Sequence, residues 1–165
     1  MKIKDIVIAT LAAASVTLAW AQAPAHRMIT DKDLKWEDVP SLPPGAKAAM
    51  IEGPMNEAVP FTVRIKVPNN YKVPPHFHPA VERVTVLKGA FAMGMGEKFD
   101  EKAMHTLKVG DMMIMQPKQP HYAMAKGETE LQLHGMGPWG VTYVNEADDP
   151  RKKAGAAPKK DEKKK

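Results

Sequence analysis

Residues 73–89, VPPHFHPAVERVTVLKG, place two histidines in alternate positions and a glutamate four residues after the second. Side chains two residues apart in a β-strand face the same side, so His76 and His78 would point to one place. In a continuous strand, Glu82 would lie about 13 Å from His78, too far to share an ion with it. We therefore expect residues 79–80, Pro-Ala, to form a bend between two separate strands.

Residues 110–127, GDMMIMQPKQPHYAMAKG, supply a third histidine. Gly110 belongs to a turn signal that leads into a short apolar strand. Pro117 and Pro120 bracket the next turn, and His121 follows at the start of the returning strand.

These two segments resemble the two motifs of the cupin superfamily. The first motif has two histidines, a glutamate and a glycine at fixed spacings, and His76, His78, Glu82 and Gly89 match all of them. We expect Gly89 to close its strand with a turn. The resemblance extends over residues 50–140.

The second motif is matched less completely. Gly110 and His121 stand at the family separation, but Pro117 comes one place late. Residues 119–120, Gln-Pro, occupy the place of a family glycine, and Ala125 replaces an asparagine that sometimes follows. These departures concern the shape of the turn more than the chemistry.

The resemblance implies an all-β fold, a single cupin double-stranded β-helix or jelly-roll barrel. It also implies one divalent metal ion bound by His76, His78, Glu82 and His121, and a homodimer. Three imidazoles and a carboxylate suit Mn, Fe, Co, Ni, Cu or Zn, and the ligands do not choose among these metals. Open positions on such an ion could bind a substrate oxygen or dioxygen, or activate water. The alternative is that the histidines are polar residues on the wet face of a strand.

The rest of the chain agrees with an all-β sandwich or barrel. Short apolar or alternating segments recur between glycine, proline and asparagine residues, which is typical of such folds. The expected strands cover residues 47–53, 61–67, 82–89, 90–96, 104–110, 111–117, 121–127, 130–136 and 140–145. Residues 30–40 could form a short helix or an edge strand.

We divide the chain into four parts: a signal peptide (1–21), an N-terminal extension (22–45), the cupin domain (46–148) and a disordered lysine-rich tail (149–165). Lys2 and Lys4 precede an apolar segment over residues 6–19, and a small-x-small site follows at residues 19–21. This pattern predicts cleavage near Ala21 and a periplasmic or secreted protein without a membrane span, although a buried N-terminal helix is the alternative. The absence of cysteine excludes disulfides and thiolate sites.

The basic character of the chain comes from its C-terminal end. Residues 151–165 contain eight Lys or Arg and two acidic residues, whereas the whole chain has a net charge of +5. The preceding residues are therefore slightly acidic, and nucleic acid is not an expected partner. The tail is either solvated or in contact with anionic surfaces such as lipid.

Other residues are candidates for supporting roles. His134, Tyr122 and Arg64 could contact a substrate or lie behind the metal ligands, whereas we expect His105 to be exposed. The chain has twelve methionines. Thioethers favour copper(I), but methionine also fills irregular cores, and we expect Met113 and Met115 to line the barrel from one strand face.

The functional prediction is a metal-binding protein that acts on, or binds, a small organic molecule with an apolar part. As an enzyme it would be a metal-dependent oxygenase, isomerase or lyase, because all of these occur among cupins and the fold does not choose among them. The alternative is a non-catalytic periplasmic protein that binds or senses a small molecule or copper.

Overall fold

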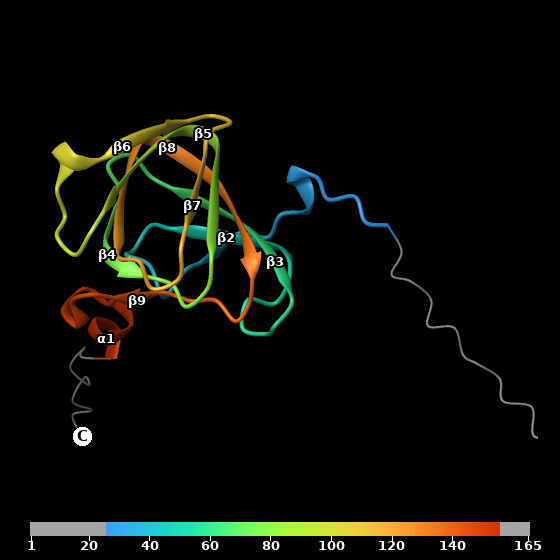
Figure 1. Cartoon of the computed structure of the whole chain (residues 1–165). Helices are drawn as coiled ribbons and strands as arrows, with labels where there is room; N and C mark the ends of the chain where they lie inside the picture. Colours follow the sequence, from blue (N-terminus) through green and yellow to red (C-terminus); the bar gives the residue numbers. More distant parts are fainter. Residues whose placement is uncertain (1–25, 156–165) are drawn as a thin grey trace, which may run out of the picture.

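Nine β-strands dominate the computed structural model, which describes residues 26–155 (Figure 1). The strands are β1 (Glu37–Asp38), β2 (Lys47–Glu52), β3 (Pro60–Val67), β4 (Lys72–Phe77), β5 (Glu82–Met95), β6 (His105–Lys108), β7 (Met112–Met115), β8 (His121–Met136) and β9 (Thr142–Tyr143). Three 3-10 turns, η1 (Asp31–Asp33), η2 (Glu101–Ala103) and η3 (Glu146–Asp148), and one helix, α1 (Pro150–Gly155), complete the described chain. No helix among these residues is long and apolar enough to cross a membrane.

The strands form two layers that share β5 and β8. The first part of β5 pairs with β7 on one side and with the last part of β8 on the other, and β8 then pairs with β3. The last part of β5 pairs with β6 and with the first part of β8, which pairs with β4. Because both long strands pass from one layer to the other, the sheet curls into a barrel (Figure 1). The prediction of an all-β jelly-roll barrel is confirmed.

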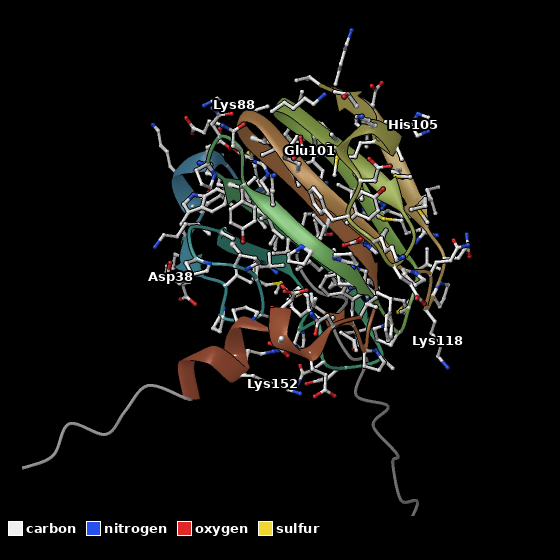
Figure 2. The ribbon with its side chains drawn as sticks, turned by 90° about the vertical axis from the view of Figure 1, so that its left-hand side faces the viewer. Asp38, Lys88, Glu101, His105, Lys118 and Lys152 are labelled. Carbon is white, nitrogen blue, oxygen red and sulfur yellow. The ribbon has the colours of Figure 1, made fainter. Side chains whose placement is uncertain are left out.

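Gly89 and Gly127 are the corners at which β5 and β8 change layers. Both have positive φ angles, +73° and +85°, and the register of β5 against β8 shifts around Gly89. The prediction that Gly89 closes its strand was therefore wrong: the strand bends there and continues to Met95. The two strands expected at residues 82–89 and 90–96 are one long strand, β5. Those expected at 121–127 and 130–136 are likewise one strand, β8. Lys88, beside the first corner, lies at the opposite end of the molecule from Lys152 of α1 (Figure 2).

The core lies between the two layers. On β3, Phe61, Val63, Ile65 and Val67 are buried, and the residues between them are partly exposed. This alternation is the direct result of the period of two in a strand, which sends every second side chain inward. Most inward positions carry branched or aromatic residues, which pack well on a pleated surface.

The last part of the N-terminal extension, from β1 onward, joins the barrel. Residues 30–40, expected to be a helix or an edge strand, contain a little of each, η1 and β1, and β1 pairs with β2. Two buried tyrosines hold the segment that follows: the hydroxyl of Tyr71 donates to the carbonyl of Pro43, and that of Tyr143 to the carbonyl of Ser41 at 2.9 Å.

The C-terminal tail was expected to lack structure from residue 149. Its first residues instead form α1, and Arg151 makes ion pairs with Asp149 and donates to the carbonyl of Val141. These contacts attach the start of the tail beside β9, at the lower end of the barrel in Figure 1. The predicted signal peptide and residues 156–165 lie outside the described residues.

Replacement of the two corner glycines by alanine should separate backbone strain from steric conflict. At Gly127 an added Cβ meets nothing within 4 Å, so only the positive φ is unfavourable, at about 1–2 kcal/mol. At Gly89 the Cβ would also lie 2.4 Å from the carbonyl oxygen of Glu128. We therefore expect Gly89→Ala to lower the free energy of unfolding by about 3–4 kcal/mol, measured by urea denaturation, with Gly127→Ala as the matched control. Equal losses would show that Glu128 moves away freely.

Candidate metal centre

The histidines and glutamate of the first motif lie on either side of a bend, as predicted. His76 is in β4, which ends at Phe77, and His78 follows directly. Glu82 is the first residue of β5. The break between the strands brings the carboxylate back to the histidines, which a straight strand could not do.

The third histidine joins them through strand pairing. His121 is the first residue of β8 and stands opposite His76 in the antiparallel pair of β4 and β8. The ring centroids of the three histidines are 4.3–5.1 Å apart, and one ring nitrogen of each lies within 4.8 Å of the others. All three side chains are buried, and the structure therefore brings them together inside the barrel.

Backbone carbonyls fix the orientation of each imidazole. The Nδ1 atoms of His76, His78 and His121 lie 2.7, 2.7 and 3.0 Å from carbonyl oxygens of Pro74, Gly140 and Gln119, respectively. A carbonyl oxygen can only accept, so each Nδ1 carries the proton. In a neutral ring, Nε2 then keeps a lone pair that is free to bind a cation, the arrangement found behind most histidine metal ligands.

Two of these hydrogen bonds share a local sequence pattern. His76 follows Pro75 and His121 follows Pro120, and in both cases the acceptor is the carbonyl of the residue before that proline. A proline restricts the preceding residue to extended backbone. The X-Pro-His pattern therefore sets the direction of the acceptor carbonyl through local geometry.

Glu82 lies beside two of the three histidines. Its Oε2 atom is 3.2 Å from Nε2 of His78 and 3.6 Å from Nε2 of His121. Despite these distances, neither nitrogen has a hydrogen bond of acceptable geometry within the described chain, and both are buried. Lone pairs of two nitrogens and a carboxylate thus face one another in a buried space, which is unfavourable unless a cation lies among them.

The protonation states at neutral pH suit metal binding. Burial, together with the neighbouring imidazoles, lowers the pKa of His76 to about 3, so this ring is neutral. Burial alone would raise the pKa of Glu82, but the closeness of the His78 and His121 imidazoles to its carboxylate outweighs burial and lowers this pKa to about 2. A neutral imidazole and an ionised carboxylate are the forms that bind a divalent ion.

A cavity extends from this cluster into the barrel. Its volume is about 90 Å³, several times the roughly 10–15 Å³ that one water needs. Its walls are mainly valine, leucine, isoleucine and phenylalanine side chains, and apart from the cluster they include no Asp, Glu, Lys or Arg. This is the usual form of a small-molecule site: apolar walls with a few polar groups at one place.

Parts of the chain outside the motifs complete the wall of the cavity. Val39, Ser41 and Leu42 contribute from the N-terminal extension, and Trp139 contributes from the connection between β8 and β9. The indole of Trp139 stacks on the ring of His78, with centroids 4.3 Å apart and planes at 19°. No periodic pattern surrounds Trp139, and sequence reasoning therefore missed it.

The structure does not bring His134, Tyr122 or Arg64 to this cavity. Leu133 faces inward, so its neighbour His134 faces the other side of the sheet. Arg64 faces outward for the same reason, between Val63 and Ile65. The expected roles of these residues beside the metal are therefore not supported.

The outward-facing candidates have other partners. Arg64 forms ion pairs with Asp31 and Glu130. Tyr122 packs on Phe99 and donates its hydroxyl to the carbonyl of Asp100 at 3.2 Å. His105 is exposed on β6, as expected (Figure 2).

The methionines of the described chain differ in their position relative to the cavity. Met115 is in the core and Met113 packs against it, which confirms that these two share an inward strand face. Neither lines the cavity, whereas Met55 and Met93 do.

Comparison with known proteins agrees with the fold and the motif positions. Residues 63–136 match the cupin domain family, and this match includes all four candidate ligands. These residues form a cupin domain. Among solved structures, an RmlC-like cupin from Shewanella frigidimarina has 17% identity and a TM-score of 0.53, with 67% of this chain and 89% of that chain covered. Comparison with functionally curated proteins gave no match.

Two further cupins of similar fold have named activities. The polyketide cyclase RemF from Streptomyces resistomycificus has 18% identity and a TM-score of 0.62, with 81% of this cupin and 95% of RemF covered. Salicylate 1,2-dioxygenase from Pseudoaminobacter salicylatoxidans, in adducts with gentisate, has 15% identity and a TM-score of 0.52, with 63% of this cupin and 30% of the dioxygenase covered. At these identities the likeness concerns the fold.

The hydrogen bond from Tyr143 to Ser41, which holds the N-terminal wall of the cavity, should be lost at high pH. Burial, with a further contribution from Asp149, raises the pKa of Tyr143 to about 12. A raised pKa in the folded state means that this contribution to stability is present below pH 10 and is lost as the pH rises from 10 to 12. Tyr143→Phe removes the titrating hydroxyl together with its bond, a loss of about 1 kcal/mol at pH 7.

We expect the difference in unfolding free energy between wild type and Tyr143→Phe to shrink and then change sign across pH 10–12, at up to about 1.4 kcal/mol per pH unit. Urea denaturation at several pH values measures this difference. Parallel curves for the two proteins would contradict the expected coupling.

Proposed function

We propose that this cupin binds one divalent transition-metal ion through Nε2 of His76, His78 and His121, together with the carboxylate of Glu82. The observation that carries the proposal is the convergence of unpaired lone pairs in a buried space. In neutral rings, Nδ1 protons held by backbone carbonyls leave the Nε2 atoms as acceptors. A cation among the four groups would relieve their repulsion.

We further propose that the metal-loaded barrel binds a small organic molecule that is largely apolar. The walls of the cavity favour such a molecule, and a polyhydroxylated one would find few partners among them. The polyketide cyclase and the salicylate dioxygenase show that this fold can hold organic molecules. Their likeness to this chain concerns the fold and indicates no particular reaction.

Each residue of the site has a definite task in this proposal. When bound, the ion would supply a Lewis-acid position for an oxygen of the ligand. The backbone carbonyls hold the imidazoles in place, Glu82 supplies negative charge, and the apolar walls exclude water. Isomerase, lyase and oxygenase chemistry are all compatible with this set, as is binding without catalysis.

Copper handling is the second candidate function, and the two methionines in the cavity wall, Met55 and Met93, favour it. Three imidazoles and a carboxylate nonetheless form a harder ligand set than copper(I) prefers. The metal found in protein from its native compartment would distinguish the two functions.

Loss of a ligand histidine should remove the metal. We expect about one ion per chain in the wild type, measured by elemental analysis, and roughly a tenth of that or less in His76→Ala and His121→Ala. The wild type should also gain about 2.7 kcal/mol of stability when free metal exceeds Kd a hundredfold.

His105→Ala is the matched control, because this histidine is exposed and lies outside the cluster. It should keep both the metal content and the stabilisation by metal. If His76→Ala and His121→Ala also keep both, the barrel interior is not a metal site.

We also propose that the protein is exported, on the basis of the N-terminal sequence. Cleavage after Ala21 would make Gln22 the first residue of the mature chain. Mass spectrometry of the protein from the periplasm or medium of its producing cells should find this N-terminus. Intact protein with Met1, found only in the cytoplasm, would contradict export.

A further inference from the structure

Trp139 has a fixed position next to the candidate ligands. Its backbone N–H donates to the carbonyl of Met55 at 2.7 Å, and its ring is stacked on His78 on one side. Phe61 lies against it with ring centroids 5.6 Å apart and planes at 47°. The indole is therefore held by packing and a backbone bond, and its orientation does not depend on its own N–H group.

That N–H group has no partner within the described chain. Nε1 of Trp139 is buried, yet it makes no hydrogen bond with another described residue. A buried indole N–H usually finds an acceptor, because leaving it unpaired is unfavourable. Phe61 has no acceptor atom, and the ring of His78 lies over the face of the indole rather than in its plane.

The cavity is the space in which an acceptor could lie. Three buried side-chain nitrogens without partners belong to residues of the cavity wall: Nε2 of His78, Nε2 of His121 and Nε1 of Trp139. The first two belong to the metal cluster. Trp139 therefore supplies the remaining unpaired donor, and its stacking on His78 places it beside that cluster.

Charge also limits what the site can accept. One ionised Glu82, three neutral imidazoles and a divalent ion would sum to one positive charge, and no Lys or Arg lines the cavity. A ligand with a single negative charge would neutralise the site. A second negative charge would have no counter-charge in the wall.

We infer that the site selects small apolar monocarboxylates, with Trp139 as a specificity-determining residue that donates its indole N–H to one carboxylate oxygen. The inference rests on the proposed metal site, which would take the other oxygen. A ligand with one oxygen, such as a phenol, could use the metal but would leave the N–H unpaired. The N–H thus distinguishes a two-oxygen group from a one-oxygen group.

Benzoate and phenol are matched probes for this inference, because both are compact aromatic molecules and only benzoate has two oxygens. Binding to the zinc-loaded full-length protein is measured by calorimetry, after the zinc content of each variant has been determined. We expect Trp139→Phe, which keeps an aromatic ring, to weaken benzoate about tenfold and phenol less than about twofold. Trp36→Phe, which changes a tryptophan packed under Lys66 outside the cavity wall, is the control and should change neither affinity.

A direct readout comes from nitrogen-15 NMR of the zinc-loaded Trp36→Phe protein. The indole N–H signal of Trp139 should move downfield when benzoate is added, as a hydrogen bond forms, and should stay in place with phenol. A role in packing alone would not produce this difference.

Several results would overturn the inference. Equal weakening of benzoate and phenol in Trp139→Phe would assign Trp139 to packing, and unchanged benzoate affinity would exclude the hydrogen bond. If the zinc-loaded wild type binds neither probe, the monocarboxylate inference fails while the metal site stands. If the wild type does not retain zinc, the proposed function itself fails.

Discussion

Three hydrogen bonds from imidazole N–H groups to backbone carbonyls determine what the centre of this barrel can do. Each of them places the proton of a histidine on Nδ1 and leaves Nε2 with a lone pair. Without them a ring could turn its proton toward Glu82 and satisfy the carboxylate within the protein. With them the four groups form a negatively charged, buried set that attracts a cation. The fold supplies this constraint through rigid backbone, and in two cases through a proline directly before the histidine.

The apolar walls of the cavity strengthen the electrostatic interactions of the polar groups at its centre. Water is scarce in such a space, so charges inside it interact more strongly than they would at the surface. The stacking of Trp139 on His78 joins the wall to the centre, and the N-terminal segment held by Tyr71 and Tyr143 closes the side. The site is therefore made from residues distributed over nearly the whole described chain, although the candidate ligands come from two short motifs.

The motifs themselves could be predicted from the sequence, because simple geometry governs them. The reach of Glu82 required a bend after His78, and the bend is there. Gly89 was misjudged because a glycine with positive φ serves equally in a turn and in a bulge. Only the partner strand, with the carbonyl of Glu128 pressed against it, decides between the two.

The supporting residues show where local pattern stops being informative. Because Leu133 faces the core, its neighbour His134 must face away from it. The sequence alone does not show which face of this strand is buried, so it could not give this result. Trp139 had no such pattern, since it lies in a connection whose shape depends on contacts with residues 55–61. The start of the tail was likewise ordered by tertiary contacts of Arg151.

The sharing of β5 and β8 between the two layers has a consequence for cooperativity. Neither layer can open alone, because each long strand would have to leave its partners in both. The candidate ligands are divided in the same way, with Glu82 at the start of β5 in one layer and the histidines on or beside β4 and β8 in the other. An ion held among them would act as a cross-link between layers. It would suppress the rare global opening of the barrel rather than the fraying of its edges, and would lengthen the lifetime of the folded state as a whole.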